Sequence, residues 1–75
     1  MLETYTLYFV RPRCEHDEQI TVASLPEATR AAQVRLERLV EEEGLAAVHV
    51  TIWSDGEPLG TLDYVGGAYS WQPPK

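Results

Sequence analysis

Hydrophobic and polar residues alternate in several short stretches of the chain, as they do in β-strands that bury one face. Thr4–Val10, Gln19–Ala23 and Ala47–Trp53 show this alternation and are rich in β-branched and aromatic residues. Gly60–Val65 and Ala68–Gln72 follow with the same pattern. The alternation predicts five strands over these ranges.

The residues between the first two strands, 11–18, read RPRCEHDE. This stretch is longer than a tight hairpin needs, so we expect a loop there.

One segment, residues 25–43, has the periodicity of a helix. At 100° per residue its apolar side chains gather on one stripe, and Gly44 follows with the freedom to adopt a left-handed cap. At the start, the Ser24 hydroxyl can accept from the Glu27 N–H while the Glu27 carboxylate reaches back to the Ser24 N–H. The predicted stripe consists of Leu25, Ala28, Ala32, Leu36, Leu39 and Val40.

The element order is therefore β-β-α-β-β-β, which predicts a two-layer α+β fold with one helix on an antiparallel five-stranded sheet. Chain directions and a right-handed crossover favour the strand order 2-1-3-4-5. The 75 residues have room for one domain, with residues 72–75 as a flexible tail.

The turns determine which side chains share a face of the sheet. Gly66-Gly67 suits a two-residue turn that pairs Tyr64 with Tyr69. A strict two-residue turn at Asp55-Gly56 would instead pair Val50 with Thr61, against the hydrophobic pattern.

One extra residue after that turn restores the pattern, because it pairs Val50 with Leu62. We therefore predict a bulge or a longer loop at residues 57–60.

On this register, one face of the sheet packs on the helix and the other, the open face, has no second layer to cover it. The open face mixes aromatic and hydroxyl side chains, a composition that suits association with a protein and also suits solvated strands. The candidate interaction surface on it consists of Tyr8, Val10, His49, Thr51, Trp53, Leu59, Thr61 and Asp63.

The formal net charge is −6, and most of it falls in the second half of the chain. Residues 39–75 hold six acidic residues against Lys75 alone. We therefore expect no direct binding to nucleic acid, because phosphate binding relies on clustered Lys and Arg. An acidic half of this kind can also dock on a basic surface of a partner.

The single cysteine, Cys14, leaves no second thiol for a disulfide within the chain and favours a reducing compartment. The first ten residues lack the basic region of a signal peptide, and their apolar run is too short to span a bilayer. These features predict a cytoplasmic protein that does not enter a membrane.

Cys14 and His16 raise the question of a nucleophile with its base, or of a metal site. A pair two residues apart in a loop rarely reaches the geometry for nucleophilic attack, and no oxyanion donor is identifiable. A closed zinc site needs four ligands, and adding His49 gives three. We expect no metal and no cofactor.

His49 opposite Asp63 resembles a general base with its orienting carboxylate, but such pairs also form as simple cross-strand neighbours. Arg11 and Arg13 can bind an anion, although the acidic residues that follow them are expected to neutralise them. Residues 41–43 are a run of glutamates, which usually forms a solvated helix end. None of these residues is assigned a catalytic role.

The sequence therefore favours a small interaction module without enzymatic activity that associates through the open face, with a homodimer as one form. One alternative is an acidic regulator that docks on a basic surface of a partner and so mimics nucleic acid. The other is a small ligand-binding protein or enzyme that uses His49 and Asp63.

Overall fold

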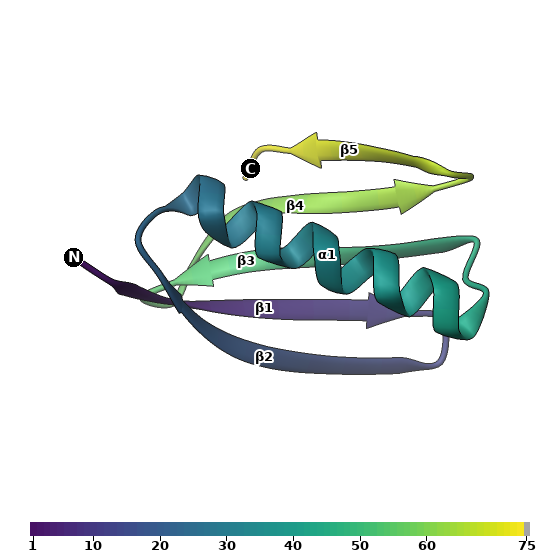
Figure 1. Cartoon of the computed structure of the whole chain (residues 1–75), viewed down its shortest axis with the longest axis horizontal. Coiled ribbons are helices and arrows are strands. Elements are labelled where there is room, and N and C mark those ends of the chain that lie inside the picture. The colour runs from purple at the N-terminus through teal and green to yellow at the C-terminus, as the bar shows by residue number, and fades with distance from the viewer. Residues whose placement is uncertain (75) are drawn as a thin grey trace.

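The computed structural model describes residues 1–74 and has the predicted α+β architecture (Figure 1). The elements in chain order are β1 (Glu3–Arg11), β2 (Cys14–Val22), α1 (Leu25–Glu43), β3 (Ala47–Ser54), β4 (Glu57–Val65) and β5 (Ala68–Gln72). All neighbouring strands are antiparallel, and the sheet order β2-β1-β3-β4-β5 confirms the prediction. Of the expected tail, Gln72 belongs to β5, Pro73 and Pro74 have no secondary structure, and Lys75 lies outside the described residues.

Helix α1 lies on one face of the sheet and crosses it diagonally, from the β4 side at its first residues toward β1 at its last (Figure 1). Its inner stripe is buried at Ala28, Ala32 and Leu36. The two alanines bring the helix backbone close to the strands, because their side chains take up little space. The sheet contributes the larger core residues Tyr5, Leu7, Phe9, Ile20, Val48, Val50, Ile52 and Leu62.

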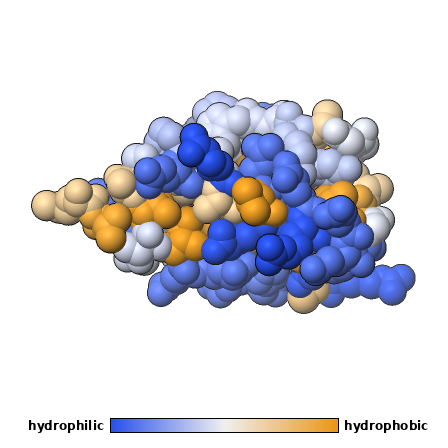
Figure 2. Space-filling view, in the orientation of Figure 1, coloured by the Kyte–Doolittle hydropathy of each residue, from blue (hydrophilic) through white to orange (hydrophobic). Residues whose placement is uncertain are grey.

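The outer surface on the helix side is mostly hydrophilic (Figure 2). Hydrophobic side chains gather toward the N-terminal end of the chain, where Met1 and Leu2 are exposed. The opposite face of the sheet is turned away from the viewer in Figure 1, and no helix of residues 1–74 covers it.

The expected loop over residues 11–18 is wrong. β1 and β2 form a tight hairpin in which Arg11 pairs with Cys14 around the turn Pro12-Arg13. Proline fits the second position of such a turn because its ring presets the φ angle that a type I turn requires there. The strand was missed because polar residues occupy both of its faces from Cys14 onward, so no hydrophobic alternation marks it.

The bulge between β3 and β4 confirms the prediction. The turn Asp55-Gly56 is a two-residue turn with both φ angles positive, at 51° and 79°, as a type I′ turn requires. The pairing then shifts by one residue, with Ile52 opposite Gly60 and Trp53 opposite Pro58. Leu59 is therefore the extra residue.

The helix ends are partly as predicted. Gly44 adopts the left-handed conformation, with φ of 64°, and its N–H donates to the Val40 carbonyl at 2.9 Å. At the other end, the Ser24 side chain makes no capping hydrogen bond. The Glu27 carboxylate accepts instead from the N–H of Ala23, at 3.0 Å, one residue before the expected donor.

Trp71 lies directly over Gly60 on the neighbouring strand. A Cβ atom built on Gly60 would lie 2.1 Å from the indole ring, and the φ angle of Gly60 is +155°. The indole thus fills the space where a side chain would stand, and it remains 39% exposed at its outer side. Trp71 stands opposite the buried Leu62, so it lies on the helix side of the sheet, with its ring over Gly60.

We therefore expect Gly60→Ala to destabilise the fold by about 1–2 kcal/mol, because it strains the backbone and displaces the indole. Urea unfolding followed by tryptophan fluorescence measures this change. In a Trp71→Ala background the same substitution should have a smaller effect, since only the backbone strain remains. An equal effect in both backgrounds would show that the indole contact contributes nothing.

Candidate functional site

The open face is organised in rows that run across the strands. In one row Asp17, Tyr8, Thr51 and Thr61 stand side by side on β2, β1, β3 and β4. Next to it, Thr6 of β1 lies opposite Trp53 of β3. The middle of the face is therefore built from two aromatic rings set among threonines.

A third row contains Val10, His49 and Asp63. All of the predicted surface residues on the three rows are half-buried by their neighbours in the sheet: Tyr8, Val10, His49, Thr51, Trp53, Thr61 and Asp63.

Leu59 is not part of this face. It packs against the hydrophobic core, so its assignment to the candidate interaction surface is wrong. The bulge explains the difference, because Leu59 and Gly60 together stand opposite Ile52, whose side chain is buried in the core.

Hydrogen bonds hold several polar groups of the open face. The hydroxyls of Thr51 and Thr61 lie 3.0 Å apart across β3 and β4. The Tyr8 hydroxyl donates to the carboxylate of Glu15 on β2. This hydrogen bond, with partial burial and the nearby charges of Glu15 and Asp17, raises the pKa of Tyr8 above its ordinary value of 10.0.

The charges on the open face have one sign. Among residues 1–74, the strands present carboxylates there from Glu15, Asp17 and Asp63, beside the imidazole of His49. Within residues 1–74, the arginines lie on α1 or at the β1–β2 turn, with Arg11 directed to the helix side. The face is therefore acidic at neutral pH.

Glu15 and Asp17 were missing from the predicted surface because residues 11–18 were expected to be a loop. The sequence does contain a signal for them: the alternation that places Ile20 and Val22 on the helix side can be extended toward residue 14. It places residues 14, 16 and 18 on the helix side and residues 15 and 17 on the open face.

A shallow pocket of about 390 Å³ opens on this face between the two aromatic residues. Tyr8 and Trp53 come from neighbouring strands, and Asp17 and Asp55 contribute carboxylates from β2 and from the β3–β4 turn. The complete lining is Thr4, Thr6, Tyr8, Asp17, Trp53, Asp55 and Gly56.

His49 and Asp63 are cross-strand partners, as predicted, but their side chains form no hydrogen bond. The His49 Nδ1 and Asp63 Oδ1 atoms lie 3.9 Å apart, beyond hydrogen-bond distance. Their side chains are 43% and 32% exposed, so the site also admits water freely. The Tyr8 hydroxyl does not assist them, since it is directed to Glu15 on β2.

Cys14 and His16 lie on the helix side of β2, where they surround the Arg11 guanidinium. Arg11 Nη2 donates to Cys14 Sγ at 3.0 Å and to His16 Nδ1 at 3.2 Å. The His16 ring stacks on the buried Phe9, with centroids 4.8 Å apart. The arrangement gives both side chains a structural partner in Arg11.

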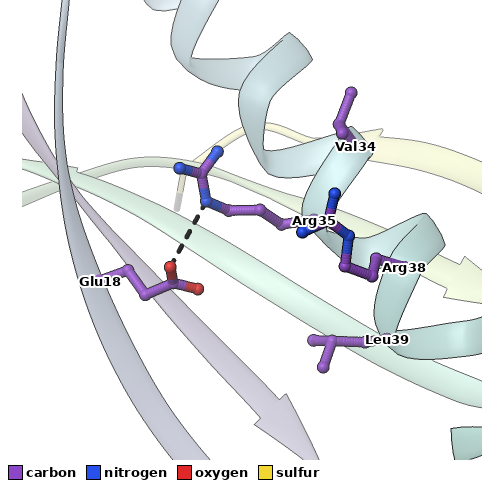
Figure 3. A pocket seen from close by; sticks show the side chains of 5 residues that line it. All are labelled: Glu18, Val34, Arg35, Arg38 and Leu39. Atoms are coloured by element: carbon purple, nitrogen blue, oxygen red, sulfur yellow. Dashed lines mark ion pairs between the residues drawn. The ribbon is translucent and has the colours of Figure 1, made fainter. Parts of the chain in front are cut away.

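Further along the helix side of β2, a chain of polar contacts leads from His16 to the helix. His16 Nε2 lies 3.4 Å from Glu18, and Glu18 lies 3.5 Å from the Nε atom of Arg35 on α1. Figure 3 shows Arg35 reaching from the helix to Glu18 across a groove of about 350 Å³ that Val34, Arg38 and Leu39 also line. Within residues 1–74, no three His, Cys, Asp or Glu side chains are grouped so that they could hold a metal ion.

The expected neutralisation of Arg11 by its sequence neighbours is wrong. Its guanidinium pairs instead with Glu43 at the end of α1. No basic residue occurs in the last turn of the helix, so Arg11 supplies from β1 the positive charge that the negative end of the helix dipole favours. The last glutamate of the run 41–43 is therefore an anchor between helix and sheet.

Comparisons with known proteins give no match to a family model, to a curated protein or to a solved structure. In residues 1–74, no helix combines the length and the apolar character that crossing a membrane requires.

Removal of the Arg11 side chain should lower the melting temperature, because it breaks the contact between β1 and the end of α1. We expect a clear drop for Arg11→Ala in thermal unfolding followed by circular dichroism. Arg13→Ala is the matched control, since Arg13 is exposed at the adjacent turn and should change the unfolding free energy by less than about 0.5 kcal/mol. Equal melting temperatures for the two variants would contradict the anchoring role of Arg11.

The tyrosines predict a loss of stability at alkaline pH. Hydrogen bonds to Glu3 and Glu15 are the main causes that raise the pKa of Tyr5 and Tyr8, and desolvation is the main cause for Tyr69. The folded state thus favours the neutral phenol, so stability is complete below about pH 10, where unfolded tyrosine is neutral, and falls as pH rises through the folded-state pKa values.

Urea unfolding between pH 8 and 12 measures this dependence, and the absorbance of the phenolate follows the ionisation itself. Glu15→Gln should bring the Tyr8 titration down toward the ordinary pKa. An unchanged titration curve in that variant would contradict the hydrogen bond as the cause.

Proposed function

We propose that this protein is a non-enzymatic interaction module that binds a protein partner through the open face. The observation that carries the proposal is the set of aromatic and aliphatic side chains on a sheet face that no helix covers. Tyr8, Trp53 and Val10 lie there among hydroxyl groups, and Val65 at the edge of the face is 64% exposed. A surface of this composition can exclude water against a partner while its hydroxyls form hydrogen bonds.

A second copy of the chain is the simplest partner, since a small domain gains buried area by dimerisation. In a face-to-face homodimer, however, two surfaces of the same sign would approach each other. Salt would then strengthen the association by screening the repulsion.

The acidic character of the face favours the second candidate, a regulator that docks on a basic partner. Among the described residues, Arg11 is the only Arg or Lys on a strand, and it is directed to the helix side. The open face therefore offers mainly negative charge to a partner. Binding to a basic surface should weaken as salt is added, which is the opposite of the homodimer.

The third candidate, a ligand-binding protein or enzyme that uses His49 and Asp63, has little support. The two side chains lie too far apart to hydrogen bond, and they are open to water. If His49→Ala changed the binding of any ligand found for the protein, this candidate would return.

The oligomeric state tests the homodimer directly. Light scattering at micromolar concentration, at low and at high salt, gives the mass of the particle. A dimer that becomes a monomer in Thr51→Arg, at the centre of the open face, supports face-to-face association. Val34→Arg is the matched control, because Val34 is 52% exposed on the outer side of α1 and lies away from the open face. A monomer at both salt concentrations would overturn the homodimer.

For a different partner, cross-linking in an extract of the native host identifies what binds. The purified partner should bind the wild type and the Val34→Arg variant with similar affinity. We expect Thr51→Arg to abolish binding, with circular dichroism confirming that the variant folds. Equal binding of both variants would show that the open face is not the interface.

A further inference from the structure

We infer that the pocket between Tyr8 and Trp53 receives an arginine side chain of the partner. This inference rests on the proposed function, and it names the chemistry by which the open face would recognise its partner. Two features of the pocket support it, its aromatic walls and its two carboxylates.

The aromatic walls suit a planar cation. Tyr8 and Trp53 are diagonal neighbours, because Thr51 stands opposite Tyr8 and Thr6 opposite Trp53. The faces of aromatic rings carry negative potential, and an arginine guanidinium stacks on such faces more readily than a lysine ammonium does. Tryptophan and tyrosine also give the aliphatic stem of the arginine an apolar surface to lie on.

The carboxylates stand where the charge of that cation would need partners. Asp17 belongs to β2, directly opposite Tyr8, and Asp55 belongs to the turn after β3. In the part of the chain from residue 1 to 74, neither carboxylate forms a salt bridge. A guanidinium between the rings can donate to a carboxylate through two parallel N–H groups, which is the strongest ion-pair geometry available to it.

The remaining lining residues are small and add acceptors. Thr4 and Thr6 are small hydroxyl residues on β1, and Gly56 has no side chain to obstruct the opening. Asp55 has a left-handed conformation in the tight turn, with φ of 51°, and its exposed side chain lies at the rim of the pocket. The volume of about 390 Å³ falls within the range of pockets that bind small groups.

Two arginines of the same chain are held by partners of their own and do not compete for this pocket. Arg11 pairs with Glu43 and Arg35 pairs with Glu18, both on the helix side. Arginine from a partner is therefore the occupant that the charge and shape of the pocket together favour.

The test uses the isotope-labelled protein and three short capped peptides that differ at one residue, arginine, lysine or citrulline. Citrulline keeps the planar shape of the arginine head group but has no charge. We expect the arginine peptide to shift the indole N–H signal of Trp53 and the backbone signals of Thr6 and Gly56. The Trp53→Phe variant assigns the indole signal, since Trp71 contributes the other one.

The lysine peptide should bind about tenfold more weakly, and the citrulline peptide should cause no saturable shift. In Asp17→Asn and in Asp55→Asn, the dissociation constant of the arginine peptide should rise several-fold. Asp63→Asn is the control on the same face, because Asp63 does not line the pocket. Equal shifts from the arginine and citrulline peptides would overturn the inference, and so would shifts confined to the helix glutamates.

The failure of this inference can be separated from the failure of the proposed function. If Thr51→Arg abolishes partner binding while Asp17→Asn and Asp55→Asn leave it unchanged, the open face is the interface and the arginine pocket is wrong. If Thr51→Arg has no effect on partner binding, the interface itself is wrong.

Discussion

The fold depends on strict alternation of side chains along each strand, with a single interruption after the Asp55-Gly56 turn. Because side chains point to opposite faces at successive positions, a one-residue shift would exchange the core and solvent sides of a whole strand. The extra residue, Leu59, shifts the pairing of β3 and β4 by one position and so brings Leu62 opposite Val50. Every later position of β4 and β5 inherits its face from that correction.

A second consequence of one helix on one face is a separation of charge. The helix side contains the arginine contacts, with Arg11 and Arg35 tied to glutamates across the boundary between helix and sheet. The open face keeps carboxylates without such partners at Asp17 and Asp55. The paired arginines therefore lie on the helix side of the sheet. In the described chain, the carboxylates of the open face are left without arginine partners, which makes that face acidic.

Much of the fold could be predicted from the sequence, because its signals are local. Alternation marks four of the strands well, the Gly66-Gly67 turn determines the β4–β5 register, and Gly44 ends the helix where the apolar stripe ends. The bulge also followed, since the hydrophobic pattern allowed only one pairing of Val50. The start of β2 was missed because its polar residues carry no such contrast.

The site was harder to predict for a physical reason. The partner of Arg11 lies 32 residues away on α1, and their contact depends on the direction in which the helix crosses the sheet. The pocket on the open face needs Asp55 from a turn and Asp17 from a strand that the alternation did not reveal. Leu59 was assigned to the wrong face because a bulge places two consecutive residues on the same side.

The two edges of the sheet limit how this protein can associate. β2, at one edge, carries Glu15, Asp17 and Glu18 in its first half, and β5, at the other, has only five residues before Pro73 and Pro74. Charged side chains disfavour the addition of a further strand, and proline has no N–H to donate to one. These residues disfavour the addition of a strand along the first half of β2 and at the end of β5. The chain thus displays aromatic residues on one sheet face while parts of both edges discourage strand-to-strand association.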